Sequence, residues 1–397
     1  MSEPTKILHV FSRLVRGGAE IRTVELLRRV DRRKYRFHFC ALSGLPGELD
    51  AEVRALGSPV HLLRRGGIGF ARRFRALLRQ HRFDVVQSQV LYYSGVILRL
   101  AAQCHTPIRV AQLHNTHHGR RAGLGRRLYC RLMRHWIDRY ATNIVAVSEG
   151  VMTGVWGPDW EADPRCEVLY NGLETSPFDG EPDRVGVRRE FGFADGAPLC
   201  IHVGSITPQK NHLRLVDVFA EIAGRLPAAR LLIVGCGDPR LEQRAREHVE
   251  GLGISDKVVF CGSRTDVPRL LKAADVLIFP SRWEGLPGVV QEACLAGLPV
   301  VASDLPGVRE IAALLHGVHI LPLDAPDGQW AQTVNVTLTN RASHPSHEEV
   351  CRDFAASPFA IERCVESNCR IWQGRIPKAA KGDVIREWVL RETNTGT

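Results

Sequence analysis

Long apolar runs are missing from this sequence of 397 residues. No stretch of about eighteen consecutive apolar residues occurs, so we expect no membrane-spanning helix. The first residues lead directly into a predicted strand, without the apolar core of a secretion signal. The sequence therefore does not predict a membrane-spanning or exported protein.

Closely spaced cysteine pairs are also missing, although the chain has eleven cysteines. The number is odd, the cysteines lie scattered in mostly apolar segments, and none forms a Cys-x-x-Cys pair. Neither a zinc site nor a disulfide framework is indicated by this pattern. We therefore expect a protein of a reducing compartment.

Acidic residues are scarce in the first half of the chain. Residues 1–178 hold 28 Lys and Arg against 15 Asp and Glu, whereas residues 179–397 hold 25 against 28. Two stretches of the first half interleave arginine with apolar residues at helical spacing. The first has Arg72, Arg73, Arg75 and Arg79 with Ala71, Phe74, Leu77 and Leu78; the second has Arg126, Arg127, Arg131 and Arg134 with Leu128, Leu132, Trp136 and Tyr140.

Basic amphipathic helices of this kind have two interpretations. They can lie on an anionic membrane surface, or they can be ordinary helices that face a core and expose their arginines to solvent. No nucleic-acid-binding motif accompanies the charge, so we expect no nucleic-acid partner.

Short β-branched apolar runs alternate with helical patterns along the chain. This alternation is typical of buried parallel strands joined by helical crossovers. It predicts an α/β fold with two doubly wound, Rossmann-like domains. The predicted strands are 6–11, 36–41, 60–63, 84–87, 108–113, 143–147 and 166–169, followed by 199–203, 230–234, 257–261, 275–279, 299–302 and 319–321.

A stretch rich in Pro, Gly and Asp separates the two series of strands. We predict an N-terminal domain over 1–175, a linker over 176–185, a second domain over 186–357 and a final segment over 358–397 that begins with a helix. Ligands of such folds bind outside the carboxyl ends of the strands, so we expect the substrates in a central cleft that the two domains face.

Residues 280–303 carry the strongest chemical signal. Glu284 follows a predicted buried strand, Pro287 is predicted to open a short helix, and Glu292 lies inside that helix, with seven residues between the two glutamates. One carboxylate can reach sugar hydroxyls and the other a ribose. The amides that point out of the positive helix end can hold phosphates; they belong to Leu286, Gly288 and Val289. This order of groups describes a nucleotide sugar.

The segment resembles the E-x7-E motif of retaining nucleotide-sugar glycosyltransferases of family 4, which have the GT-B fold. Gly285, Pro287, Gly297 and Pro299 stand in the family's register. The resemblance implies a nucleotide-sugar donor on the second domain and a saccharide or lipid-linked saccharide acceptor on the first. It also implies a final helix packed toward the N-terminal domain, no metal or other cofactor for catalysis, and a cytoplasmic enzyme of cell-surface polysaccharide or glycolipid synthesis.

Within this resemblance, Glu284 is expected to position the donor sugar and Glu292 the ribose. Lys210 matches the lysine that neutralises the donor diphosphate, in a loop that begins with Gly204. Many family members carry arginine where this chain has Ser205. The alternative for Lys210 is an ordinary surface lysine before a helix.

The resemblance assigns three further positions. His114 matches the histidine that faces the donor sugar, although a purely structural histidine is the alternative. The resemblance implies that Gly17 and Gly18 lie beside the diphosphate; the alternative is a plain strand-to-helix turn. It also implies that Gly262 lies near the nucleotide base. His117 and His118 raise the question of a metal, but adjacent histidines point in different directions and no carboxylate is close in sequence.

Two other functions share the expected architecture. A sugar-nucleotide epimerase would use a similar nucleotide crevice, and a non-catalytic nucleotide-sugar-binding protein is suggested by Ser205. A nicotinamide enzyme is not indicated, because the loop from Gly235 to Asp238 lacks the third glycine of a dinucleotide fingerprint.

Overall fold

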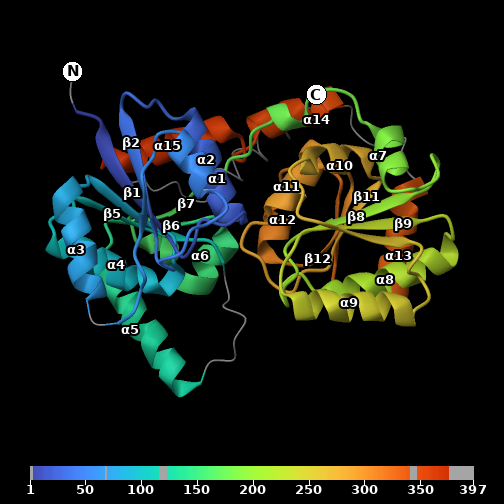
Figure 1. Cartoon of the computed structure of the whole chain (residues 1–397), viewed down its shortest axis with the longest axis horizontal. Helices are drawn as coiled ribbons and strands as arrows, with labels where there is room; N and C mark the ends of the chain where they lie inside the picture. Colours follow the sequence, from blue (N-terminus) through green and yellow to red (C-terminus); the bar gives the residue numbers. More distant parts are fainter. Residues whose placement is uncertain (1–2, 68, 116–122, 340–346, 375–397) are drawn as a thin grey trace. The chain divides into compact units, whose positions relative to one another are not determined.

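The computed structural model describes residues 3–67, 69–115, 123–339 and 347–374. Contacts divide the chain into unit 1, Met1–Leu173 with Ile361–Thr397, and unit 2, Glu174–Ala360. Each unit has its own parallel sheet with helices on both faces (Figure 1). The predicted α/β class with two Rossmann-like domains is confirmed.

Unit 1 is built on seven parallel strands in the order β3-β2-β1-β4-β5-β6-β7. The strands are β1 (Thr5–Phe11), β2 (Tyr35–Ala41), β3 (Val60–Leu62), β4 (Val85–Ser88), β5 (Ile108–Leu113), β6 (Asn143–Ala146) and β7 (Cys166–Val168). The helices are α1 (Gly18–Arg29), α2 (Asp50–Ala55), α3 (Phe70–His81), η1 (Leu91–Tyr93), α4 (Ser94–Gln103), α5 (Leu124–Tyr140), α6 (Glu149–Trp156), η2 (Trp160–Ala162) and α15 (Ile361–Trp372).

Helix α15 returns to unit 1 and completes its core. Trp372 is buried, contacts the ring of Phe37 edge-on at 5.2 Å, and donates its indole N–H to Gln87 Oε1 at 2.7 Å. A Cβ on Gly172 would lie 2.6 Å from Cys364 Cβ, so only glycine allows this close approach of the chain to α15. The final helix thus belongs to the packing of unit 1. Ser148 caps the start of α6, where its Oγ accepts from Val151 N at 3.1 Å.

Unit 2 is built on six parallel strands in the order β10-β9-β8-β11-β12-β13. The strands are β8 (Leu199–Val203), β9 (Arg230–Val234), β10 (Val258–Gly262), β11 (Val276–Phe279), β12 (Val300–Ser303) and β13 (Val318–Leu321). The helices are η3 (Ser176–Phe178), α7 (Arg184–Glu190), α8 (His212–Arg225), α9 (Pro239–Gly251), α10 (Val267–Ala273), α11 (Gly288–Leu295), α12 (Pro306–Ala312), α13 (Asp327–Thr339) and α14 (His347–Ala356).

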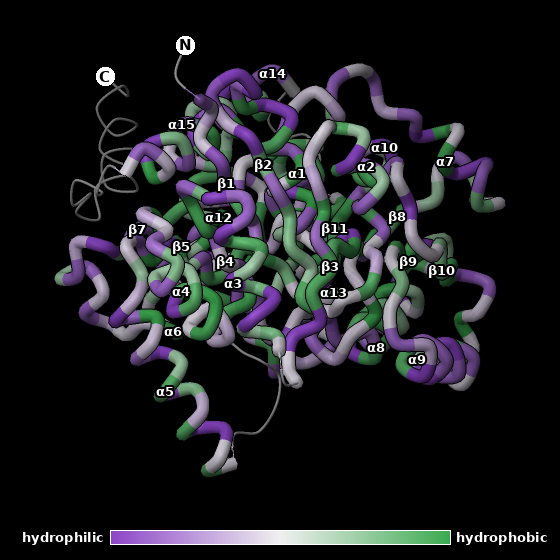
Figure 2. Tube along the Cα trace, turned by 60° about the vertical axis from the view of Figure 1, so that its left-hand side comes forward, coloured by the Kyte–Doolittle hydropathy of each residue, from purple (hydrophilic) through white to green (hydrophobic). Residues whose placement is uncertain are grey.

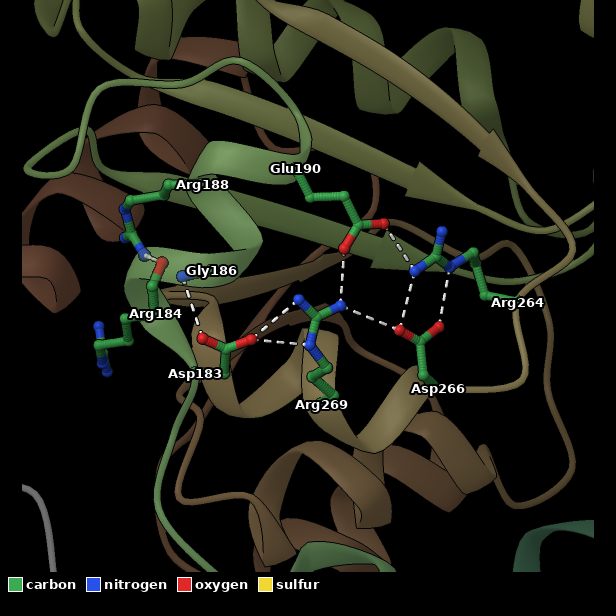
Figure 3. A network of polar contacts seen from close by, with 8 residues as sticks. All are labelled: Asp183, Arg184, Gly186, Arg188, Glu190, Arg264, Asp266 and Arg269. Atoms are coloured by element: carbon green, nitrogen blue, oxygen red, sulfur yellow. Dashed lines mark hydrogen bonds and ion pairs between the residues drawn. The ribbon is translucent and has the colours of Figure 1, made fainter.

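Charged contacts fasten the first segment of unit 2 to its sheet. Arg188 and Asp275 form a buried ion pair at 2.8 Å, and Lys272 Nζ donates to the carbonyls of Phe178 and Asp179 at 2.7 and 3.1 Å. The stretch expected to be the linker therefore packs against α10 within unit 2. Figure 3 shows the neighbouring network, in which Arg269 contacts Asp183 and Glu190.

The two basic helices of unit 1 differ. Helix α3 buries Phe74, Leu77 and Leu78 and turns its arginines outward, as a core-facing helix does. Helix α5 buries only Met133 and Ile137 among its described residues. Its first half leaves leucines in solvent, because Leu124, Leu128 and Leu132 are 84, 68 and 45% exposed. The core-facing interpretation thus holds for α3 and fails for Leu128 and Leu132 of α5.

Candidate functional site

The predicted donor residues of unit 2 gather where its strand order reverses. Strands β8 and β11 are adjacent and parallel, with Cys200 beside Val276, while the chain runs from β8 to β9 on one side and from β11 to β12 on the other. Loops that leave such neighbouring strands at their carboxyl ends diverge and form the usual ligand site of doubly wound folds. Lys210 lies after β8 and Glu284 after β11.

Lys210 and Glu284 form an ion pair at this point. Lys210 Nζ lies 2.7 Å from Glu284 Oε1, and the two side chains are 16 and 8% exposed. The other oxygen of Glu284 accepts from Gln209 Nε2 at 2.8 Å. The Lys210 ammonium also lies 4.7 Å from the ring centre of Phe279. Both charges are thus largely removed from water yet paired with each other, as buried ions require.

The loop that carries Glu284 is held by the loop that carries Lys210. Arg282 N donates to Gln209 O at 2.8 Å, and Arg282 Nε donates to Asn211 Oδ1 at 3.0 Å. Asn211 has a left-handed φ of 56° and donates from Nδ2 to Pro280 O at 3.2 Å. The positions of the ammonium and the carboxylate are therefore coupled through backbone and side-chain contacts.

Glycines allow the loops after β8 and β9 to approach each other. A Cβ on Gly235, whose φ is 138°, would lie 2.2 Å from the carbonyl oxygen of Gly204. A Cβ on Gly204 would lie 3.0 Å from the Lys210 side chain. Gly235 N donates to Gly262 O at 2.8 Å. This bond joins Gly262, the residue expected near the nucleotide base, to the loops after β8 and β9. Ser205 follows Gly204, so no guanidinium extends from that position.

Helix α11 begins one residue later than the sequence predicts, at Gly288, with Pro287 as its N-cap residue. Its first amides, including Gly288 and Val289, have no partner inside a helix and lie at the positive end of the helix dipole. Leu286 is 8% exposed directly before them. Glu292 lies in the second turn of the same helix. Glu284, the amide row and Glu292 thus follow one another along a short piece of chain.

Arg264, two residues after Gly262, is part of a structural network (Figure 3). Its guanidinium lies 2.8 Å from both Asp266 and Glu190. Arg264 holds the pKa of Asp266 at about 2. Arg264 is therefore occupied by protein carboxylates. At Gly262 itself, only backbone groups are available to a ligand.

In unit 1, Gly17 and Gly18 lie at the start of α1, directly after the loop that follows β1. The carboxylate of Glu20 turns back onto Gly17, whose added Cβ would lie 2.5 Å from Glu20 Oε2. Burial raises the pKa of Glu20 to about 7. A glutamate that is half-protonated near neutral pH therefore lies beside Gly17. The sequence pattern around Gly17 and Gly18 predicts no role for Glu20.

His114 belongs to a row of neutral polar groups. Its Nε2 donates to Gln89 Oε1 at 2.7 Å, and Gln89 Nε2 lies 3.2 Å from His9 Nδ1 and 3.4 Å from Thr23 Oγ1. Burial lowers the pKa of His114 to about 4 and that of His9 to about 3. Both imidazoles are therefore uncharged at neutral pH.

Gln89 and His9 were missed by sequence reasoning. Gln89 follows β4 as His114 follows β5, and β4 lies next to β1 where the strand order of unit 1 reverses. The sequence signal that could have identified Gln89 is its place as a polar residue directly after a predicted buried strand. No such signal exists for His9, which lies inside β1. His117 and His118 lie outside the described residues.

Family models match both halves of the sequence. The model of Glycosyltransferase Family 4 matches residues 16–177, and that of Glycosyl transferases group 1 matches residues 184–344. The chain belongs to glycosyltransferase family 4. It is a glycosyltransferase that uses a nucleotide-sugar donor, and its two doubly wound domains have the GT-B architecture. This assignment sets aside the epimerase alternative.

Individual proteins agree with the family. The chain is 26% identical over 347 residues to the capsular polysaccharide biosynthesis glycosyltransferase CapH of Staphylococcus aureus, covering 87% of this chain and 93% of CapH. It is 25% identical over 238 residues to an Escherichia coli UDP-Gal:alpha-D-GlcNAc-diphosphoundecaprenol alpha-1,3-galactosyltransferase, covering 58 and 60% of the two chains.

A solved structure supports the fold. The chain superposes on HepE of Anabaena in complex with UDP-glucose with a TM-score of 0.79 and 19% identity, covering 93% of this chain and 99% of HepE. At this identity the likeness concerns the fold alone. Among the helices of the described ranges, none has the length and hydropathy needed to cross a bilayer.

Proposed function

We propose that this protein transfers a sugar from a nucleotide diphosphate to a hydroxyl group of a saccharide acceptor, with retention of the anomeric configuration. The observation that carries the proposal is the Lys210–Glu284 pair at the switch point of the donor unit. A cation is needed there because negative charge grows on the diphosphate as the nucleotide leaves.

Each candidate residue has a role in this reaction. Lys210 and the amides of Gly288 and Val289 stabilise the leaving diphosphate, with Leu286 adjacent. Glu284 positions the donor sugar, and Glu292 binds the ribose. Backbone groups at Gly204, Ser205 and Gly262 line the nucleotide, and Gly17 and Gly18 lie beside the diphosphate. His114, kept neutral by burial, hydrogen-bonds the sugar.

The ion pair describes the resting state of the site. A diphosphate that binds near Lys210 supplies a stronger anionic partner for the ammonium, and Glu284 is then released toward the sugar hydroxyls. The pair keeps two buried charges neutralised until the donor arrives. Nucleotide binding and the release of Glu284 are thus the same event.

Two observations point to the class of acceptor: the products of relatives and the exposed face of α5. CapH belongs to capsular polysaccharide biosynthesis, and the galactosyltransferase is named for an acceptor that carries diphosphoundecaprenol. We propose a cell-surface polysaccharide or a glycolipid as the product, made in the cytoplasm. The acceptor is then a saccharide that a lipid can anchor.

The first half of α5 fits a membrane surface. Figure 2 shows α5 extending from the rest of unit 1, with hydrophobic and hydrophilic positions alternating along it. Leu128 is 68% exposed and Leu132 45% exposed, and Arg127 and Arg131 lie among them. Apolar side chains that enter the interface and arginines that meet anionic lipid are the two parts of peripheral binding.

A panel of nucleotide sugars, each with and without a lipid-linked acceptor, tests the transfer. The expected result is transfer, or slow hydrolysis of one donor when no acceptor is present, with an α-configured donor giving an α-linked product by NMR. Binding without turnover for every donor and acceptor would contradict the proposal, and an inverted product would contradict retention.

Vesicle sedimentation tests the role of α5. The expected result is binding that rises with anionic lipid, falls with salt, and is lost in Leu128→Asp/Leu132→Asp. The matched control is Arg72→Gln/Arg79→Gln on α3, which should bind vesicles nearly as well as the wild type. Equal binding to neutral and anionic vesicles would contradict the proposal.

A further inference from the structure

Three histidines meet in unit 1 on elements that carry none of the residues assigned above. His38 lies in the middle of β2, His61 in the middle of β3, and His81 at the last position of α3. One potential ligand nitrogen from each ring lies within 4.8 Å of the other two. Among the described residues, this is the one group of three or more His, Cys, Asp or Glu side chains close enough to hold a metal ion.

The rings are arranged around a common point rather than along a line. His38 Nδ1 lies 3.1 Å from His61 Nε2, and these two rings are stacked with centroids 5.4 Å apart. The ring of His81 is tilted against both, at 4.9 Å from His38 and 5.1 Å from His61. Phe83 closes one side, with its ring edge-on to His38 at 5.0 Å.

The imidazoles of His38 and His61 are in the neutral form that binds metal. Burial lowers the pKa of His38 and of His61 to about 4, and the neighbouring histidines act in the same direction. Neutral imidazole has a free nitrogen lone pair and is the commonest metal ligand in proteins. Arg36, Arg54 and Lys6 also face the group, and their positive charge moderates its affinity for a cation.

We propose that His38, His61 and His81 form a binding site for one divalent transition-metal ion of the imidazole-preferring class, with Zn²⁺ as the representative ion. Zinc binds histidine nitrogen at about 2.0–2.1 Å, so tetrahedral ligands lie about 3.3 Å apart. His38 and His61 already have nearly this separation. His61 and His81 are only half-buried, which leaves their rings free to turn by the remaining distance.

A metal here would act on the structure of unit 1. Strand β3 has three residues and lies at the edge of the sheet, and α3 ends at His81. One ion would tie this short edge strand and the end of α3 to the buried strand β2. With three protein ligands, the fourth position stays open to water. No recognised zinc-binding spacing marks these histidines in the sequence, because His38, His61 and His81 are each separated from the next by about twenty residues.

Cobalt titration of the full-length protein, free of an affinity tag and dialysed against chelator, tests the site. We expect one equivalent of Co²⁺ to bind at micromolar concentration with visible d–d absorption, and Zn²⁺ to displace it and abolish the absorption. Zn²⁺ at a hundredfold excess over its Kd should raise the midpoint of thermal unfolding by roughly 5 °C or more.

The variants His61→Gln and His81→Gln should each lose more than about 100-fold in Co²⁺ affinity, since even outer-shell partners contribute 10- to 100-fold. His135→Gln, at an exposed histidine of α5, is the matched control and should bind like the wild type. Unfolding midpoints without metal, close to that of the wild type, show that the variants fold. No stoichiometric binding to the wild type, or binding that both variants retain, would overturn the proposal and leave a hydrogen-bonded histidine stack.

Discussion

Both sheets carry polar groups near the point where their strand order reverses, but the two sets differ in charge. In unit 2 the loops after the two switch-point strands hold a buried ion pair, Lys210 with Glu284. In unit 1 a neutral row runs past the switch point, with His9 inside β1, Gln89 directly after β4 and His114 after β5. His9 is fully buried, whereas Gln89 and His114 are partly exposed. Lys210 and Glu284 are 16 and 8% exposed, so the clearer difference between the two sets is their charge.

The difference follows from what each unit is proposed to bind. A departing diphosphate needs a fixed cation, because a preorganised charge in a dry site is far more effective than one in water. A sugar hydroxyl needs only directional donors and acceptors, which neutral imidazole and amide groups supply at lower desolvation cost. The region where the strand order reverses is thus adapted to a different kind of ligand in each unit.

The largest effect is expected from removing the charges of unit 2. Lys210→Ala and Glu284→Gln should each lower kcat by roughly 10²–10³, the usual cost of losing one charge-stabilising group. His114→Gln, the matched change in the neutral row, should lower kcat by a smaller factor because it retains a hydrogen-bonding amide. Steady-state kinetics measure all three. Near-normal turnover of Lys210→Ala would remove the contrast between the units.

A second prediction concerns the glycine that lets the donor loops meet. Gly235→Ala should destabilise unit 2 by about 2 kcal/mol or more and weaken nucleotide binding, because its Cβ would lie 2.2 Å from the Gly204 carbonyl oxygen at a φ of 138°. Gly224→Ala is the control. No atom lies within 4 Å of its Cβ, so this helical change in α8 should stabilise unit 2 by up to about 1 kcal/mol. Urea unfolding measures both, and equal stabilities would contradict the close approach.

The neutral row predicts how unit 1 responds to acid. The pKa of buried His9 is about 3, and unfolding returns it to about 6.5. Between these values the unfolded state binds more protons, so the stabilisation is complete above pH 6.5 and is lost as the pH falls toward 3. The slope for one fully buried histidine is at most about 1.4 kcal/mol per pH unit. Urea unfolding at pH values from 7 to 5, with hydrogen exchange of unit 1 peptides, should show a falling free energy of unfolding. A free energy that stays constant over this range would contradict the claim that His9 is neutral in the folded protein.

Glu20 should produce a smaller effect of opposite sign. Its pKa is about 7 in the folded protein and about 4.3 when unfolded. The folded state therefore binds more protons in this window, and stability falls as the pH rises through it. Glu20→Gln should therefore raise the free energy of unfolding by about 2 kcal/mol more at pH 8 than at pH 5, where only part of the ionisation penalty is present. The same increase at both pH values would show that packing, not charge, is responsible.

Most of the fold was predictable because parallel strands buried on both faces have a strong sequence signature. The runs at 6–11 and 275–279 differ from β1 and β11 by one residue at the start. The helices α13 and α14 were harder to predict, because their polar sequences weaken the apolar periodicity that marks a helix. The exposure of Leu128 and Leu132 could not be predicted, because helical spacing alone does not say whether another element covers a face.

The candidate site was predictable only where one short segment holds several groups. Glu284, Pro287 and Glu292 lie within nine residues of one another, so their spacing carries information. Gln89 and His9 are eighty residues apart and meet only because β4 pairs with β1. The ion pair between Lys210 and Glu284 could not be predicted either, because the two residues are far apart in the sequence. Each was only assigned a separate role.

Nucleotide binding by two variants tests the central claim most directly. Calorimetric titration should use the nucleoside diphosphate that the donor panel identifies, beginning with UDP. Lys210→Met should bind it roughly 10- to 100-fold more weakly, because a charged hydrogen bond is lost. Glu284→Gln should bind it more tightly than the wild type, because the Lys210 ammonium no longer has a competing carboxylate. Equal affinity in the wild type and both variants, or weaker binding in both, would contradict the claim that the ion pair opens to receive the donor.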